Sequence, residues 1–233
     1  MIESIGVIAD IHSNPEALEN VMSRLSDVER IFCLGDIIGI GPRPAEALSI
    51  VMNDRRIVSV YGNHEYNTVN GTEIGPIRIF PRAPHHAWVR KNLTDRQLEY
   101  LGGLPAVIRE VHGGIRFTLM HCHPDNCGAF VPYYDDPSPS VLDHYYEGVE
   151  GDVLLFGHTH RPLDVTGKRR YLNPGPVGAQ NGGIARFMRI DIKDERMTLV
   201  RLSEPYDRSR VVSDLKRYDV PNRRFISRVF YGD

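Results

Sequence analysis

The sequence predicts an α/β protein built around a parallel β-sheet. Short apolar, β-branched segments alternate with segments of helical periodicity along the N-terminal part of the chain, which is the pattern of a parallel sheet with helices on its faces. Each of the first three apolar segments also ends at a polar residue: Asp10, Asp36 or Asn63. Ligands of open α/β sheets bind outside the carboxyl ends of the strands, so these residues are expected to meet in one crevice.

Local signals place the first elements in order. Residues 5–9 are expected to form a buried strand, and Asn14 followed by Pro15 is typical of an N-cap and a first helical position. Apolar residues then recur at helical spacing as far as Leu25. The expected elements of this part are a helix over 15–25, a strand over 31–34, a Gly- and Pro-rich loop over 39–44, a helix over 45–52 and a strand over 57–60.

The remaining chain carries weaker signals. We expect a loop over 67–76, helices over 83–91 and 94–101 with an N-cap at Leu93-Thr94-Asp95, strands over 115–120 and 153–156, a long loop over 124–139, a short strand at 171–173, and an antiparallel pair over 184–191 and 196–202. The chain is predicted to form a single domain, 1–233, with an insertion around 66–104 that could cap the site and a charged, weakly patterned C-terminal tail around 203–233.

The composition excludes several classes of protein. The net charge is −2, from 28 Lys and Arg against 30 Asp and Glu, so bulk charge gives no strong signal for nucleic-acid binding. The hydrophobic content of 41% excludes wholesale disorder, and no apolar run approaches the roughly 18 residues of a membrane span. The N-terminus lacks the basic start of a signal peptide, and the cysteine count of three is odd. A reducing cytoplasm is therefore the expected location.

Histidine is the residue that points to chemistry. Five segments that contain His, Asp or Asn follow one another along the chain. They are Asp10-Ile11-His12, Gly35-Asp36, Gly62-Asn63-His64, His121 and Gly157-His158-Thr159-His160. In extended segments, residues two apart point the same way, so Asp-x-His and His-x-His could each present two ligands. The mixed oxygen and imidazole set suits Mn, Zn, Fe or Ni. Seven candidate ligands are too many for one ion and suit two ions that share a carboxylate.

Taken singly, these segments mean little. Asn after Gly is ordinary turn chemistry, and a lone His-x-His is structural about as often as it binds a metal. The order of the segments, each at the end of an expected strand, is what favours a metal site over five unrelated turns.

The order of segments resembles that of the calcineurin-like metallophosphoesterases, in particular the small prokaryotic phosphodiesterases. The family pattern is Asp-x-His, Gly-Asp, Gly-Asn-His followed by Asp or Glu, then His, then Gly-His-x-His, and here Glu65 follows His64. The matching stretch runs from about residue 5 to residue 175. The resemblance implies a four-layer α/β/β/α sandwich of two mixed β-sheets flanked by helices, which modifies the single-sheet expectation. It would put the C-terminal antiparallel pair in the second sheet.

The resemblance also implies a role for each residue. The first ion would be held by Asp10, His12 and His160, the second by Asn63, His121 and His158, and Asp36 would bridge the two. Both would be divalent transition-metal ions, with manganese as the first choice and iron, zinc or nickel as alternatives. His64 would not bind metal; it would contact the phosphate and protonate the leaving oxygen.

The implied activity is the hydrolysis of a phosphodiester in a small molecule by a metal-bridging hydroxide. A dinucleoside tetraphosphatase or a phosphoprotein phosphatase could use the same ligands. A non-catalytic scaffold on this fold is a weaker alternative, because His64 and all the candidate ligands are present. The sequence favours neither a membrane nor a nucleic-acid partner, and it leaves the oligomeric state open.

The sequence departs from the family after His121, where relatives usually have Gly and this chain has Cys122 and then His123. Cys122 is expected to pack in the interior. His123 is expected to line the substrate cleft, with Asn63 and His64 as the other substrate-contacting residues. A separate zinc site at Cys122 and Cys127 is disfavoured because no second cysteine pair exists. His85 and His86 are expected to pack at the surface or the cleft edge rather than to bind metal.

Overall fold

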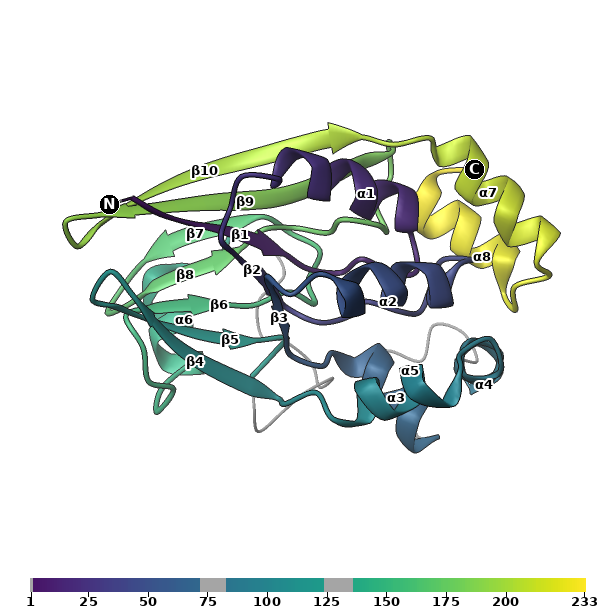
Figure 1. The fold of residues 1–233 in the computed structure, drawn as a ribbon, viewed down its shortest axis with the longest axis horizontal. Helices are drawn as coiled ribbons and strands as arrows, with labels where there is room; N and C mark the ends of the chain where they lie inside the picture. The colour runs from purple at the N-terminus through teal and green to yellow at the C-terminus, as the bar shows by residue number, and fades with distance from the viewer. Residues whose placement is uncertain (1, 72–82, 124–135) are drawn as a thin grey trace.

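The computed structural model describes residues 2–71, 83–123 and 136–233. Its strands form two mixed β-sheets that pack face to face (Figure 1). The first sheet has the strand order β10-β9-β1-β2-β3 and the second has the order β4-β5-β6-β8-β7. The strands of the first sheet are β1 (Glu3–Ile8), β2 (Arg30–Cys33), β3 (Ile57–Ser59), β9 (Ile184–Lys193) and β10 (Arg196–Pro205). Those of the second are β4 (Val107–His112), β5 (Ile115–Met120), β6 (Val153–Leu155), β7 (Leu163–Thr166) and β8 (Arg170–Asn173).

Helices cover the outer faces of both sheets, which confirms the four-layer sandwich. They are α1 (Pro15–Arg24), α2 (Pro44–Asn53), α3 (Asn63–Asn70), α4 (Ala83–Lys91), α5 (Asp95–Gly102), α6 (Pro139–Tyr145), α7 (Arg208–Arg217) and α8 (Arg223–Ile226), which continues into a π-helical turn (Ser227–Tyr231). One core lies between the sheets, and two others lie under the helices: α1, α2 and α7 against the first sheet, and α6 against the second.

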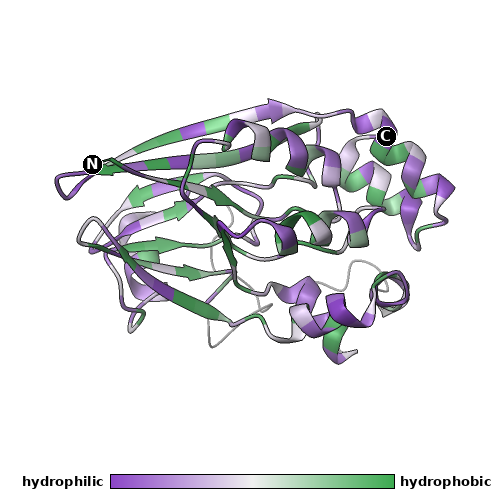
Figure 2. Ribbon diagram, viewed as in Figure 1, coloured by the Kyte–Doolittle hydropathy of each residue, from purple (hydrophilic) through white to green (hydrophobic). Residues whose placement is uncertain are grey.

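The expectation that the C-terminal antiparallel pair belongs to the second sheet is wrong. Strand β9 pairs antiparallel with β1, with Val7 opposite Met188, and so extends the first sheet. It covers the edge of β1 that β2 leaves open and thereby satisfies the backbone groups there. Hydrophilic and hydrophobic residues alternate along much of β9 and β10 (Figure 2). Met188 and Ile190 enter the core between the sheets, and Phe187 faces the helices.

Several expected elements agree with the structure at their capping residues. Asn14 Oδ1 accepts a hydrogen bond from Ala17 N at 3.1 Å, with Pro15 as the first residue of α1. Thr94 and Gln97 form a reciprocal capping box at the start of α5. The expected loop over 67–76 is wrong in its first part, because α3 continues to Asn70. Gly71 ends that helix, and residues 72–76 lie outside the described residues. Most of the expected loop over 124–139 also lies outside them.

The tail predicted from residue 203 begins inside β10 and then forms α7 and α8. Asp207 caps α7 by accepting from the backbone N–H groups of Ser209 and Arg210. Val211 and Leu215 of α7 are buried in the same core as α1 and α2. Figure 1 shows the helices of the tail at the end of the molecule toward which α1 and α2 also extend. The single domain and the capping insertion over 66–104 stay predictions.

None of the helices within the described ranges combines the length and the apolar character that a bilayer crossing requires.

Candidate metal centre

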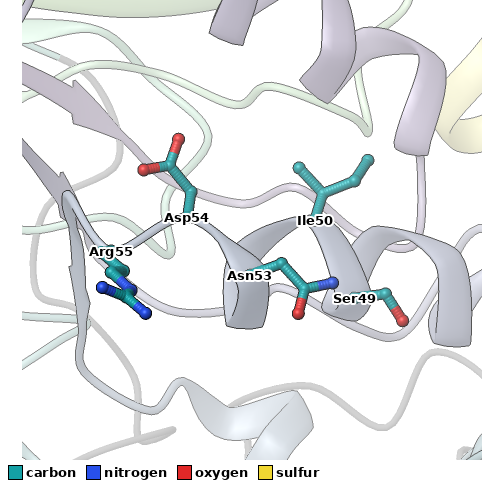
Figure 3. A pocket seen from close by; sticks show the side chains of 5 residues that line it. All are labelled: Ser49, Ile50, Asn53, Asp54 and Arg55. Carbon is teal, nitrogen blue, oxygen red and sulfur yellow. The ribbon is translucent and has the colours of Figure 1, made fainter.

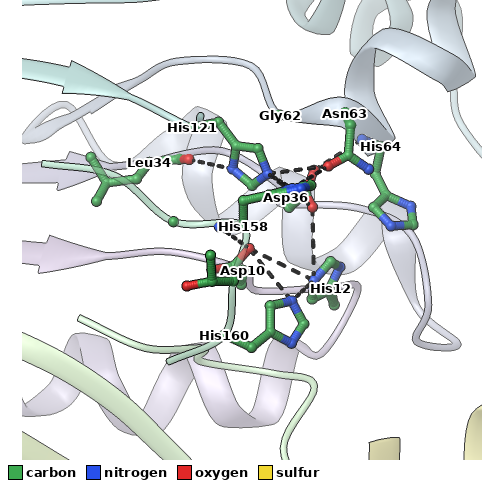
Figure 4. Close-up of polar contacts among 12 residues, drawn as sticks. Asp10, His12, Leu34, Asp36, Gly62, Asn63, His64, His121, His158 and His160 are labelled. Atoms are coloured by element: carbon green, nitrogen blue, oxygen red, sulfur yellow. Dashed lines mark hydrogen bonds and ion pairs between the residues drawn. The ribbon is translucent and has the colours of Figure 1, made fainter. Parts of the chain in front are cut away.

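The ends of strands from both sheets bring the predicted ligands together (Figure 4). Five described turns or helix starts deliver them: after β1, after β2, after β3, after β5 and after β6. The residues are, in that order, Asp10 and His12, Asp36, Asn63, His121, and His158 and His160. The convergence agrees with the expectation of a single crevice, although two sheets rather than one contribute to it.

The backbone is left-handed at the ligand positions of Asp-x-His and His-x-His. The expectation that the two ligands of each pair point the same way because they lie in an extended segment is therefore wrong. The φ angles are 53° at Asp10, 48° at His12, 68° at His158 and 57° at His160, so neither pair lies in an extended segment. Such angles cost a non-glycine residue about 1–2 kcal/mol. Backbone hydrogen bonds between turns hold them, such as Asp10 N to Gly35 O at 3.1 Å. Strain of this kind concentrates at functional sites.

One group of potential ligands consists of Asp10, His12 and His160, whose ligand atoms all lie within 4.8 Å of one another. The Nε2 atoms of His12 and His160 are 2.8 Å apart, and Asp10 Oδ1 lies 3.6 Å from His160 Nε2. Asp10 is fully buried, and its Oδ2 atom has no hydrogen-bond partner among the described residues. A buried carboxylate oxygen without a partner, beside two imidazoles, fits a bound cation.

The second group is Asp36, His121 and His158, joined by Asn63. Asn63 Oδ1 lies 2.8 Å from His158 Nδ1 and 3.3 Å from His121 Nε2. Asp36 Oδ2 lies 3.2 Å from His121 Nε2 and 3.9 Å from His12 Nε2, which belongs to the first group. Asp36 is therefore the carboxylate that stands between the two groups.

Neighbouring groups fix the orientation of the imidazoles. His121 Nδ1 lies 2.8 Å from the Leu34 carbonyl, and His12 Nδ1 lies 3.4 Å from the Ile38 carbonyl. A proton on Nδ1 that is donated to a carbonyl leaves the Nε2 lone pair for a metal. Asn173 holds the turn after β6 by donating to Gly157 O at 2.8 Å. The role of Asn173 was not predicted, because no local pattern links it to that turn.

Glu65 is a second residue whose role the sequence reasoning missed. Its buried carboxylate accepts three backbone hydrogen bonds, from Asp36 N at 2.8 Å, Ile38 N at 3.0 Å and Gly62 N at 2.7 Å. It thus ties the Gly35-Asp36 turn to the start of α3. The signal was present, since Glu three residues after an N-cap position is typical of a capping box.

Burial and charge set the protonation of the centre. Burial lowers the pKa of His12 to about 3 and raises the pKa of the Asp10 carboxyl. Burial would also raise the pKa of Asp36, but the nearby imidazoles, His121 above all, hold it well below its usual value. Neutral imidazoles and an ionised shared carboxylate are the forms that bind metal ions.

His64 lies next to both groups. One of its ring nitrogens is within 4.8 Å of ligand atoms of His12 and Asp36, and its backbone N donates to Asp36 Oδ1 at 2.9 Å. His86 of α4 approaches from the other side, with its Nε2 atom 3.2 Å from His64 Nδ1. His85 and His86 are only 2% and 4% exposed, so they pack in the interior rather than at the surface.

The residues after His121 have the following surroundings. Cys122 is buried, as expected for a packing residue. The His123 ring stacks on Tyr146 at 5.8 Å between centroids and meets the edge of Tyr145 at 5.2 Å. Its contact with substrate stays a prediction. Cys127 lies outside the described residues.

Two other hollows lie away from these ligands. An open depression of about 510 Å³ at the end of α2 is lined by Ser49, Ile50, Asn53, Asp54 and Arg55 (Figure 3). A second, of about 470 Å³, lies in the tail between Lys216, Arg223, Arg224, Ser227 and Asp233. Neither contains a residue of the candidate centre.

Comparison with known proteins identifies the family and the fold. An uncharacterized protein of Methanocaldococcus jannaschii is 29% identical over 95% of this chain and 96% of its own. A crystal structure of a metallophosphoesterase from Sphaerobacter thermophilus is 25% identical, covers 99% of both chains and has a TM-score of 0.77. A hypothetical protein of Pyrococcus horikoshii has the same fold, with a TM-score of 0.84 at 20% identity over 99% of this chain and 98% of that one. Residues 4–195 match the model of the calcineurin-like phosphoesterase superfamily domain, and the chain belongs to that superfamily.

Proposed function

We propose that the protein is a dinuclear-metal phosphoesterase that hydrolyses a phosphodiester. The observation that carries this proposal is the position of Asp36, whose Oδ2 atom faces His121 of one ligand group and His12 of the other. A shared carboxylate between two groups of three ligands is the arrangement that two ions about 3.5–4 Å apart require.

In this proposal, Asp10, His12 and His160 hold the first ion, Asn63, His121 and His158 hold the second, and Asp36 bridges them. Manganese is the first choice, because the donors are oxygen and imidazole without thiolate. When bound, such ions polarise the phosphate and supply an activated water as the nucleophile. The chain itself supplies His12 as a buried imidazole whose lowered pKa keeps it neutral, and Asp36 as a carboxylate whose lowered pKa keeps it ionised, and both are metal-binding forms.

His64 is the residue proposed to act on the leaving group. It is the second residue of α3, directly after Asn63, and its ring lies beside both ligand groups. Its N–H can donate a hydrogen bond to the leaving oxygen as charge builds on that oxygen, and the loss of one such preorganised donor costs roughly 10²–10³-fold. Asn63 and His123 are the other residues proposed to contact substrate.

A diester is preferred because the order of the ligand segments resembles that of the small prokaryotic phosphodiesterases. A cytoplasmic small molecule remains the expected substrate, with a dinucleoside polyphosphate or a phosphoprotein as the alternatives.

A substrate panel tests the proposal. The Mn²⁺-loaded protein is compared on diesters, monoesters, a dinucleoside tetraphosphate and a phosphopeptide, with the His64→Ala variant beside it. We expect diesters to be cleaved fastest, and His64→Ala to lose more activity on an alkyl diester than on a bis-nitrophenyl diester, because nitrophenolate departs without a proton. A metal-loaded wild type that cleaves none of these compounds would contradict the proposal and favour a scaffold.

A further inference from the structure

We propose that His86 is a positioning residue for His64. It holds the His64 imidazole by Nδ1, so that Nε2 with its proton is the nitrogen that faces the phosphate group. The inference deepens the proposed function of His64 and rests on it. It also gives α4, which lies in the predicted insertion over 66–104, a part in the reaction. The family motifs do not suggest such a part, because they cover only His64 and the metal ligands.

The contact itself carries the argument. His86 Nε2 and His64 Nδ1 are 3.2 Å apart, and the two rings meet at 67° with centroids 5.1 Å apart. Only one N–H can lie between two nitrogen atoms at this distance. If His86 donates it, His64 Nδ1 is an acceptor, and a neutral His64 must carry its own proton on Nε2. This tautomer is the one that can donate to an oxygen through Nε2.

The other neighbours of His64 prevent its ring from turning away. A β-carbon at Gly39 would lie 2.1 Å from His64 Nδ1, so the ring rests directly against the bare backbone of that glycine. The His12 ring meets the His64 ring edge-on, with centroids 5.1 Å apart at 80°. His64 is therefore enclosed by Gly39, His12 and His86, and of these only His86 is seen to share a hydrogen bond with its Nδ1.

Helix α4 is attached to the helix that carries His64. The Arg90 side chain donates to the carbonyl oxygens of Thr68 and Val69, at 3.0 and 2.8 Å. These carbonyls lie in the last turn of α3, where a helix lacks internal partners. His85 stacks on Trp88 within α4, with centroids 6.1 Å apart at 28°. His64 at the start of α3 and His86 on α4 thus belong to one braced pair of helices (Figure 1).

The alternative is that His86 only fills space between the helices, and three variants separate the two roles. His86→Phe keeps a ring of similar size but removes the nitrogen. His86→Gln can place an amide N–H near the position of Nε2. His85→Phe is the matched control, because His85 is the adjacent residue on the same helix and is as deeply buried.

Hydrolysis by the metal-saturated variants is the first readout. We expect His86→Phe to lose about 10–100-fold on an alkyl diester and much less on a bis-nitrophenyl diester, with most of the loss restored by His86→Gln and none caused by His85→Phe. In a His64→Ala background, His86→Phe should add no further loss. Equal losses on both esters, or the same loss in both backgrounds, would overturn the proposal.

The tautomer of His64 is the second readout, and it does not depend on activity. Two-bond ¹H–¹⁵N spectra of the Zn²⁺-loaded protein report which ring nitrogen carries the proton. We expect the Nε2–H form in wild type and His86→Gln, and a mixture in His86→Phe. A wild type with its proton on Nδ1, or a His86→Phe variant with the wild-type spectrum, would contradict the proposal. Should the wild type cleave no ester, the proposed function fails while this spectrum still decides the role of His86.

Discussion

Gly62 and Asp36 are packed so closely that a β-carbon at position 62 would lie 2.2 Å from Asp36 Oδ1. The backbone of Gly62 has φ −105° and ψ −175°, an extended conformation that any residue can adopt. The glycine is therefore required by contact rather than by backbone angle. A glycine directly before a candidate ligand is also compatible with a close approach of the backbone to a bound ion. The structure instead shows two turns of the chain, at 35–36 and 62–63, in contact with each other.

Gly62→Ala should therefore move the Asp36 carboxylate and weaken both metal sites at once. We expect the affinity for each ion to fall about tenfold or more, by analogy with the loss of other groups that orient metal ligands. Gly102→Ala is the control, because the nearest neighbour of its new β-carbon in the described part of the chain would be Val69 Cγ1, at an ordinary contact distance of 3.8 Å. Metal content after dialysis is the measurement, and a Gly62→Ala protein with both ions at wild-type affinity would refute the expectation.

Gly39→Ala should damage His64 without removing metal. The new β-carbon would overlap the His64 ring, while the positive φ of 85° adds backbone strain of about 1–2 kcal/mol. Gly71→Ala separates these effects, because Gly71 also has a positive φ, 64°, but no atom of the described residues would lie within 4 Å of its new β-carbon. Both variants should lose stability in urea, and only Gly39→Ala should lose hydrolysis of an alkyl diester. Similar activity in the two variants would show that the ring contact is unimportant.

His85 should make the protein less stable in acid. Burial lowers its pKa to about 3, whereas the unfolded chain has a value near 6.5. Between these values the unfolded state binds more protons, so stability is complete above pH 6.5 and falls as the pH decreases. At pH 5 the loss from this residue is about 2 kcal/mol.

The measurement is urea unfolding of wild type and His85→Phe at pH 7 and pH 5. The other buried histidines remain in both proteins, so the difference between the two pH responses isolates His85. We expect the variant to lose less stability between pH 7 and pH 5 than wild type does. Identical responses would show that His85 is not kept neutral by the fold.

Much of the site could be predicted from the sequence because its residues are local to strand ends. The motif at Gly62-Asn63-His64, for instance, is fixed by the end of β3 and the start of α3, which lie within a few residues of each other. The ring contact between His64 and His86 could not be predicted, since it depends on how α4 docks against α3. The same is true of Asn173, whose partner Gly157 lies on a different turn.

The fold was hardest to predict where a strand pairs with another strand that is far away in the sequence. The placement of β9 depends on which sheet edge it covers, and the alternation in its sequence suits either sheet. Other elements had signals that were overlooked. Gly113-Gly114 is a hairpin turn between β4 and β5, and Asp207 is an N-cap before the apolar spacing of α7. The left-handed φ of Asp10 and His12 has no such signal, because the contacts between turns impose it.

The bridging role of Asp36 is tested most directly by the metal stoichiometry of Asp36→Asn, measured by elemental analysis beside His12→Ala. Asparagine keeps the size of the side chain and removes its charge. We predict that Asp36→Asn loses affinity for both ions together, because Oδ2 of Asp36 faces His121 and His12 alike, whereas His12→Ala loses mainly one ion. An Asp36→Asn protein that retains two ions per chain at wild-type affinity would contradict the shared carboxylate and, with it, the dinuclear centre proposed here.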